Sequence, residues 1–356
     1  MEHQLYMKRC LELAQRAKGH TSPNPMVGAV LVHNGRVIGE GWHHFYGADH
    51  AEVNCLSNVA EADRHLLPQS TMYVSLEPCA HQGITPPCAV RLVKERIKKV
   101  FIANTDPFAL VNGLGIEILK QGGIEVETGL LASEGLWVNR RFFCFHKQQR
   151  PYIILKWAQT QNGFIAPADK SRLQITGPES RRLVHKWRTE EAAIMVGYNT
   201  ALNDNPELTA RLWEGRQPLR IVLDRHLQLP ATHHIFGSAA ATWAINEERE
   251  TLHGNIHSVR LKFDDTLLTH LLHRLYDAKI RSVIIEGGAA LLSSFIKEGL
   301  WDEARILTGT TPITGGLAAP LLTNETHAFT SDIDNDTLQV YTNKNSAYPY
   351  IQGMPL

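Results

Sequence analysis

The sequence predicts an α/β protein made of two domains. The chain has 356 residues, about twice the usual length of a single domain. Apolar runs typical of strands alternate with segments of helical periodicity in both halves, and this order produces layered α/β structures. A polar stretch over residues 146–151, ending in a proline, separates the halves. We therefore expect one domain over residues 1–146 and another over residues 147–356.

The first half is expected to open with a helix and a hairpin. Apolar residues at helical spacing predict a helix over 5–17, and Asn34-Gly35 predicts a tight turn between two strands. The expected elements are strands over 27–32, 36–40, 71–76 and 99–103, and helices over 50–60, 88–99 and 113–121. Asp49 is the expected N-cap of the helix over 50–60. Two antiparallel strands followed by a β-α-β order predict a layered sheet.

The second half repeats the alternation. Its expected strands cover 152–156, 192–196, 219–223, 241–245, 282–285 and 303–307, and its expected helices cover 180–188, 267–278 and 291–297. This pattern predicts a second α/β sheet.

The composition excludes several classes of protein. Hydrophobic residues make up 43% and charged residues 20%, a globular balance rather than that of a disordered chain. Basic and acidic residues number 36 each, and residues 1–146 hold 14 of each, so neither half has the basic surplus of a nucleic-acid binder. The odd count of five cysteines does not suggest a disulfide scaffold. Without a signal-peptide pattern or a membrane-length apolar stretch, we expect a cytoplasmic protein.

One histidine and two cysteines form a candidate zinc site. His50 opens one expected helix, Cys79 follows a strand, and Cys88 opens the next helix. Three ligands suit a catalytic zinc ion, which keeps one position open for water. Glu52 could then take a proton from that water and return it to departing ammonia. His-x-Glu followed by Pro-Cys is typical of zinc deaminases, but here Cys88 lies nine positions after Cys79 rather than three.

These residues resemble the bifunctional deaminase–reductase family of riboflavin biosynthesis, and the resemblance spans nearly the whole chain. The matching segments are 23–28, 41–43, 50–52, 77–79 and 85–88 in the first half, and 142–143, 150–151, 155–158, 175–177, 197–200, 204–211, 286–288 and 301–303 in the second. The resemblance implies a cytidine-deaminase-like three-layer domain and a dihydrofolate-reductase-like α/β domain. It also implies zinc-dependent deamination of a diaminopyrimidinone ribosyl phosphate, followed by reduction of the ribosyl group to ribityl with NADPH.

The resemblance further implies roles for individual residues. Catalytic roles fall to Glu52, Lys156 and Asp204, and zinc binding to His50, Cys79 and Cys88. Substrate binding falls to Asn24, His43, His81, Thr85, Arg188, Arg211 and Glu286, with the two arginines on the phosphate. Cofactor binding falls to Thr176, Gly197, Thr200, Gly287 and Gly288. The expected partner is a small phosphorylated pyrimidine, with no nucleic acid and no membrane, and a homo-oligomer is left open.

Independently of the resemblance, the chain has no Gly-x-Gly-x-x-Gly motif, which argues against a Rossmann site. Glycines 287 and 288 stand between an expected strand and an expected helix, where the backbone can approach a pyrophosphate.

The chain departs from the family pattern at three places. Ile84 replaces a Lys or Arg, Phe108 lies where Asp-Pro-Asn-Pro is usual, and Asn162 replaces an Asp. Two alternatives stay open from the sequence. The zinc site could be structural, so that only the second half is active, or the first half could deaminate another nucleobase. The neutral charge of residues 1–146 and the attached reductase-like half argue against a base in nucleic acid.

Overall fold

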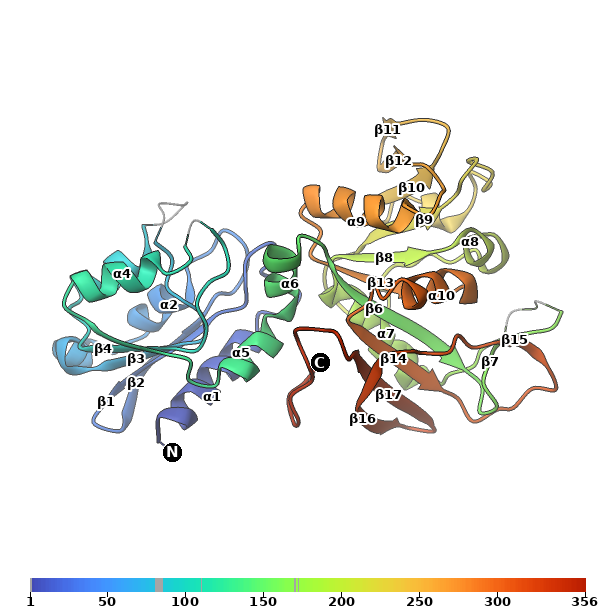
Figure 1. Cartoon of the computed structure of the whole chain (residues 1–356). Helices are drawn as coiled ribbons and strands as arrows, with labels where there is room; N and C mark the ends of the chain where they lie inside the picture. Colours follow the sequence, from blue (N-terminus) through green and yellow to red (C-terminus); the bar gives the residue numbers. More distant parts are fainter. Residues whose placement is uncertain (1, 81–85, 110, 170, 172) are drawn as a thin grey trace. The chain divides into compact units, whose positions relative to one another are not determined.

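The computed structural model describes residues 2–80, 86–109, 111–169, 171 and 173–356. The chain forms two compact units, residues 1–148 with 353–356 and residues 149–352. Each unit has its own central sheet (Figure 1). No helix among the described residues is both long and apolar enough to cross a membrane.

The first unit is built on a five-stranded sheet of order β2-β1-β3-β4-β5. Its strands are β1 (Gly28–His33), β2 (Arg36–Trp42), β3 (Thr71–Val74), β4 (Lys99–Ile102) and β5 (Glu125–Thr128). Its helices are α1 (Glu2–Gln15), α2 (Ala51–Ser57), α3 (Cys88–Lys94), α4 (Leu114–Gln121), α5 (Ala132–Val138) and α6 (Arg140–Gln148), with a 3₁₀ helix η1 (Glu61–Gln69). The expected hairpin of β1 and β2 is present, and β3, β4 and β5 are parallel.

Helices cover both faces of this sheet, which makes three layers. In β1, Ala29 and Leu31 join the core formed with α2, α3 and α4, whereas Val30 and Val32 join the core formed with α1. This alternation is the two-residue period of a strand buried on both faces. Figure 1 shows α1 on one side of the sheet and α2 and α4 on the other.

The second unit is built on a ten-stranded sheet of order β11-β12-β10-β9-β8-β13-β6-β14-β17-β16. The strands of the unit are β6 (Tyr152–Gln159), β7 (Phe164–Pro167), β8 (Ala193–Val196), β9 (Leu219–Leu223), β10 (Thr242–Asn246), β11 (Thr251–His253), β12 (Ile256–Arg260), β13 (Ser282–Glu286), β14 (Glu303–Thr308), β15 (Gly316–Ala318), β16 (Glu325–Ile333) and β17 (Asp336–Asn343). Its helices are α7 (Pro178–Glu190), α8 (Tyr198–Asp204), α9 (Leu267–Asp277) and α10 (Ala289–Lys297), with a 3₁₀ helix η2 (His234–Phe236). The strands from β12 to β14 are parallel, and β7 pairs with β15 in a separate sheet.

The strand order places a binding site near β6 and β13. From β6 the chain continues to β8 and outward to β12, then returns to insert β13 between β8 and β6. Ligands of open parallel sheets bind at the carboxyl ends of strands where the order reverses in this way. Leu155 and Ile285 are buried with α9 and α10. The next residues, Lys156 and Glu286, are register partners on the opposite face, where α7 lies.

Several expected boundaries are wrong. The N-cap of α2 is His50 rather than Asp49, and the Asp49 carbonyl instead accepts the side chains of His43 and Asn54. The helix expected over 88–99 ends at Lys94, ahead of the left-handed residue Arg96. The strand expected to end at Lys156 continues to Gln159, because it pairs with β14 as far as that residue. The elements that were not expected include β5, α5, α6, α8 and the hairpin of β16 and β17.

Candidate active sites

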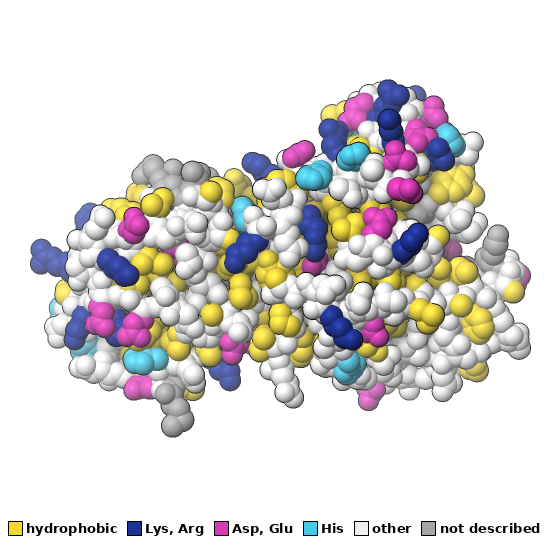
Figure 2. Space-filling model, viewed as in Figure 1, with side chains coloured by type: hydrophobic (Ala, Val, Ile, Leu, Met, Phe, Trp, Pro, Cys, Tyr) yellow, Lys and Arg dark blue, Asp and Glu magenta, His cyan; other side chains and the backbone are white. Residues whose placement is uncertain are grey.

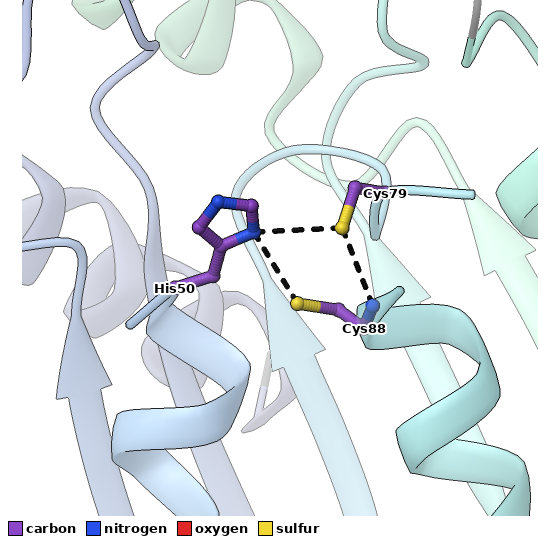
Figure 3. A group of neighbouring side chains, drawn as sticks. All are labelled: His50, Cys79 and Cys88. Carbon is purple, nitrogen blue, oxygen red and sulfur yellow. Dashed lines mark hydrogen bonds between the residues drawn. The ribbon is translucent and has the colours of Figure 1, made fainter. Parts of the chain in front are cut away.

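His50, Cys79 and Cys88 lie together in the first unit (Figure 3). The Nδ1 atom of His50 is 3.5 Å from the Cys79 Sγ and 3.4 Å from the Cys88 Sγ. With Zn–S bonds of about 2.3 Å and Zn–N bonds of about 2.0 Å, a nitrogen and a sulfur bound to tetrahedral zinc lie about 3.5 Å apart. The three donor atoms all lie within 4.8 Å of one another. Their chemistry and spacing therefore fit a zinc ion.

Glu52 lies beside these donors and has a perturbed acidity. It sits in the first turn of α2, two residues after His50, with 3% of its surface exposed. Burial, and then the charge of Cys79, raise the pKa of Glu52 to about 7. A carboxyl group with a pKa near neutrality can both accept and return a proton, as a general acid–base requires.

The two cysteines are not equivalent. The hydrogen bond from the Cys88 thiol, with help from His50, lowers the pKa of Cys79 to about 4 despite burial. The Cys88 backbone N–H also donates to the Cys79 Sγ at 3.2 Å. The same cluster thus favours the thiolate form at Cys79, the form in which cysteine binds metals.

His43 links Asn24 to this group. Its Nδ1–H donates to the Asp49 carbonyl at 3.1 Å, and its Nε2 accepts the Asn24 Nδ2 at 3.1 Å. Burial lowers the pKa of His43, in agreement with a neutral ring. The ring also meets His50 edge-on, with 5.2 Å between centroids. Since the Asn24 amide nitrogen faces His43, its amide oxygen is the atom left to accept a bond from a ligand.

Glu77 and Asn104 were not singled out from the sequence. The buried Glu77 carboxylate accepts backbone N–H groups from four residues between 106 and 116, at 3.0–3.3 Å. Its own N–H donates to the Asn104 carbonyl, so the turn that carries Cys79 is tied to this segment. The buried Asn104 Oδ1 has no hydrogen-bond partner among the described residues. The only sequence signal for Glu77 was its place in the matching segment 77–79, with no role assigned to it.

The second unit contains a cavity of about 1970 Å³ at the carboxyl ends of its parallel strands. All ten residues that the resemblance assigned to this half line it: Lys156, Thr176, Arg188, Gly197, Thr200, Asp204, Arg211, Glu286, Gly287 and Gly288. Single-ligand pockets usually measure about 300–1,000 Å³. The larger volume leaves room for a dinucleotide and a second ligand together.

Glu286 joins two cations inside the cavity. Its Oε1 is 2.7 Å from the Lys156 Nζ, and its Oε2 is 3.0 Å from the Arg188 Nη2. Burial opposes ionisation of this carboxyl, but Arg188 and Lys156 outweigh it and lower the pKa of Glu286 to about 2. The carboxylate therefore stays ionised at neutral pH and fixes both cations.

Gly287 and Gly288 form a cradle before α10. Both have left-handed φ angles, 81° and 76°. A Cβ atom at either position would lie 3.0 Å from the Thr200 side chain. Neither residue has a side chain to cover the backbone where it borders the cavity. This fits the close approach of the phosphate groups of a nucleotide cofactor.

Two of the expected site residues, His81 and Thr85, lie outside the described residues, as does Ile84. Their roles stay predictions.

Comparison with known proteins covers both units. Residues 1–104 match the cytidine and deoxycytidylate deaminase zinc-binding region, and residues 151–344 match the RibD C-terminal domain. Riboflavin biosynthesis protein RibD of Aquifex aeolicus is 40% identical over 84% of this chain and 84% of its own length. The Bacillus amyloliquefaciens protein of the same name is 39% identical over 90% of this chain and 88% of its own.

Two solved structures are also similar. A diaminohydroxyphosphoribosylaminopyrimidine deaminase/5-amino-6-(5-phosphoribosylamino)uracil reductase from Thermotoga maritima is 33% identical, with a TM-score of 0.87 over 96% of this chain and 99% of that chain. RibD from Acinetobacter baumannii is 33% identical, with a TM-score of 0.86 over 96% and 98%.

The fold and both sites thus define a bifunctional enzyme, a zinc-dependent deaminase joined to an NADPH-dependent reductase. The chain belongs to the RibD family of riboflavin biosynthesis proteins.

Proposed function

We propose that residues 1–146 deaminate 2,5-diamino-6-ribosylamino-pyrimidinone 5'-phosphate and that residues 147–356 reduce the ribosyl group of the product to ribityl. The observation that supports the proposal is that the residues expected for each step lie together, those for deamination in the first unit and those for reduction in the second. The three zinc donors and Glu52 lie in the first unit, and the ten reductase residues line one cavity in the second.

In the deaminase site, zinc held by His50, Cys79 and Cys88 would activate water for attack on the ring carbon that bears the departing amino group. Glu52 accepts the water proton and delivers a proton to the departing amine. Asn24, held by His43, orients the pyrimidine through its amide oxygen. His81 and Thr85 also contact the substrate in this proposal.

In the reductase site, bound NADPH would supply a hydride to the anomeric carbon of the ribosyl group. As that carbon gains the hydride, its bond to the ring oxygen breaks, and the oxygen takes up a proton. Lys156, fixed by Glu286 at 2.7 Å, is the group to which we assign this proton, with Asp204 beside the sugar. Arg188 and Arg211 bind the phosphate. The cofactor is held by Thr176, Gly197, Thr200, Gly287 and Gly288.

The partner in this proposal is a small molecule. On the face drawn in Figure 2, Lys and Arg side chains are interspersed with Asp and Glu. On that face the described residues form no extended basic surface of the kind that nucleic acids bind. A cytoplasmic location is part of the proposal, and the oligomeric state stays open.

The test couples the two reactions. The diamino substrate and NADPH are supplied to the whole chain, and absorbance at the NADPH band is followed before and after zinc removal. NADPH consumption that stops without zinc and returns when zinc is restored supports both sites and their order. NADPH consumption that does not change on zinc removal would show that the deaminase assignment is wrong.

Two variants separate the steps. Glu52→Gln should lose ammonia release while keeping bound zinc, because its amide cannot move the proton. Asp204→Ala should lose NADPH oxidation on the deaminated substrate while still releasing ammonia from the diamino one. Normal turnover in either variant would show that the role assigned to that residue is wrong.

A further inference from the structure

The cavity segment that carries Arg211 is held in place by side chains from elsewhere in the unit. The backbone N–H groups of Arg211 and Leu212 point at the Nδ1 atom of His185 on α7, at 2.8 and 3.4 Å. The Gln217 amide makes two bonds to the Ala210 backbone, one in each direction, at 2.7 and 3.1 Å. The segment is therefore preorganised before any ligand arrives.

The same segment sets the spacing of the two arginines. The Arg188 Nη1 donates to the Thr209 carbonyl at 3.0 Å, and the Arg211 Nη1 donates to the Thr209 hydroxyl at 3.1 Å. Arg211 also pairs with Glu207. Both guanidinium groups thus donate to the same residue, Thr209, and both arginines line the same cavity. A shift of this segment would separate two groups that must meet one phosphate.

The contact with His185 requires a neutral ring. A backbone N–H can only donate, so the His185 Nδ1 must be the acceptor and the ring proton must lie on Nε2. A doubly protonated imidazole has no acceptor left. Protonation would place a hydrogen on Nδ1, directly opposite the backbone N–H of Arg211, and the two N–H groups would repel each other. It would also add a positive charge to a cationic cavity.

Among the described residues, four charged groups act on the ionisation of His185. They are Arg188 on α7 itself, Arg211 in the loop, Lys156 on β6 and Glu286 at the end of β13. Three are cations, and Glu286 is already shared by two of them. Burial first, and then Arg188 and Arg211, lower the pKa of His185 to about 4. The ring is therefore neutral across the physiological range.

We propose that His185 is a positioning residue of the reductase site: its neutral imidazole holds the Arg211 backbone, so that Arg188 and Arg211 bind the substrate phosphate together. The inference rests on the proposed role of those two arginines. Protonation of His185 releases the segment and weakens phosphate binding, without involving the cofactor cradle.

The test uses a pair of variants of nearly equal shape. In His185→Asn, the amide oxygen takes the place of Nδ1 and accepts the same N–H groups, but it does not titrate. In His185→Leu, no acceptor is present. Binding of ribose 5-phosphate to the full chain is measured by calorimetry, with ribose as the control that lacks the phosphate.

At pH 7.5 we expect His185→Leu to weaken ribose 5-phosphate binding about tenfold or more, since a buried backbone N–H loses its partner. His185→Asn should stay within about threefold of the unchanged chain. NADPH affinity should be the same in all three. Equal ribose 5-phosphate affinities in the Leu and Asn variants would overturn the proposal.

A second measurement follows the proton. Between pH 7.5 and 4, affinity for ribose 5-phosphate should fall further in the unchanged chain than in His185→Asn, since only the former can be protonated at this position. Circular dichroism checks that both stay folded. Identical pH profiles would contradict the inference even if His185→Leu does not fold.

The variant Arg211→Met distinguishes the two proposals. Should Arg211→Met leave ribose 5-phosphate binding unchanged, the phosphate role of the arginine is itself wrong. Should Arg211→Met weaken binding while His185→Leu does not, only the positioning role of His185 fails.

Discussion

Glu286 shows how one carboxylate organises the reductase site. Each of its oxygens holds a cation, Lys156 on one side and Arg188 on the other. Glu286→Gln keeps the shape but removes the charge, so Lys156 loses its fixed orientation. We expect NADPH oxidation on the deaminated substrate to fall by about 100-fold, the effect of losing a charged partner worth ~3 kcal/mol. The exposed Glu179→Gln, on α7, is the matched control and should retain full activity.

The same carboxyl group makes stability depend on pH. Its pKa is about 2 in the folded unit against an ordinary glutamate value of 4.5, so ionised Glu286 contributes stability that is complete above pH 4.5. That contribution is lost as the pH falls from 4.5 to about 2, because the unfolded chain binds the proton first. Urea unfolding at pH 6, 4 and 3 should therefore show a shallower decline in Glu286→Gln than in the unchanged chain. Parallel declines would contradict the assignment.

The candidate sites divide into residues that the sequence can indicate and residues that it cannot. His50, Cys79 and Cys88 were predictable because their side-chain chemistry is specific, and because His50 and Cys88 stand at the starts of helices α2 and α3. His185 was not, because its partner is a backbone N–H 26 positions along the chain. Glu77 is similar, since its carboxylate accepts backbone N–H groups from a distant loop and from the first turn of α4. Contacts of that kind leave no residue-type pattern in the sequence.

At the scale of elements, the periodic segments were the predictable ones. The helix near residues 267–278 and the strand at 219–223 correspond to α9 and β9, since long helical or apolar runs carry their own signal. The hairpin of β16 and β17 was missed because its first strand is largely exposed and polar. The pairing of its second strand, β17, with β14 depends on tertiary contacts rather than on local sequence.

Gly41 controls how closely α2 approaches the sheet. A Cβ atom there would lie 2.3 Å from the Cys55 nitrogen and 2.6 Å from the Ala51 carbonyl oxygen, both backbone atoms of α2. Gly41→Ala must therefore displace the helix whose first turn carries Glu52. We expect a loss of stability of about 1–3 kcal/mol, the usual cost of overpacking, together with weaker zinc retention. Thermal unfolding and zinc content measured after dialysis check both effects.

Gly315→Ala serves as the control for that variant. A Cβ atom at position 315 meets nothing within 4 Å, and its φ is not in the left-handed region. The melting temperature and zinc content should not change. If Gly41→Ala behaved like this control, the close packing of α2 against β2 would be wrong.

For the whole molecule, two separate cores predict two separate responses to ligands. The first unit is built on the clusters around β1, β3 and β4, and the second on the cluster around β6 and β13. A ligand stabilises only the folded unit that binds it, by about 2.7 kcal/mol at 100 times its Kd. Calorimetry should therefore resolve two transitions. Zinc removal should lower one of them by roughly 5–10 °C, and NADPH should raise the other by a similar amount. Cys88→Ser, which weakens the zinc donor set, should abolish the response to chelator and leave the response to NADPH intact. A single transition that shifts as a whole with either ligand would show that the units unfold together.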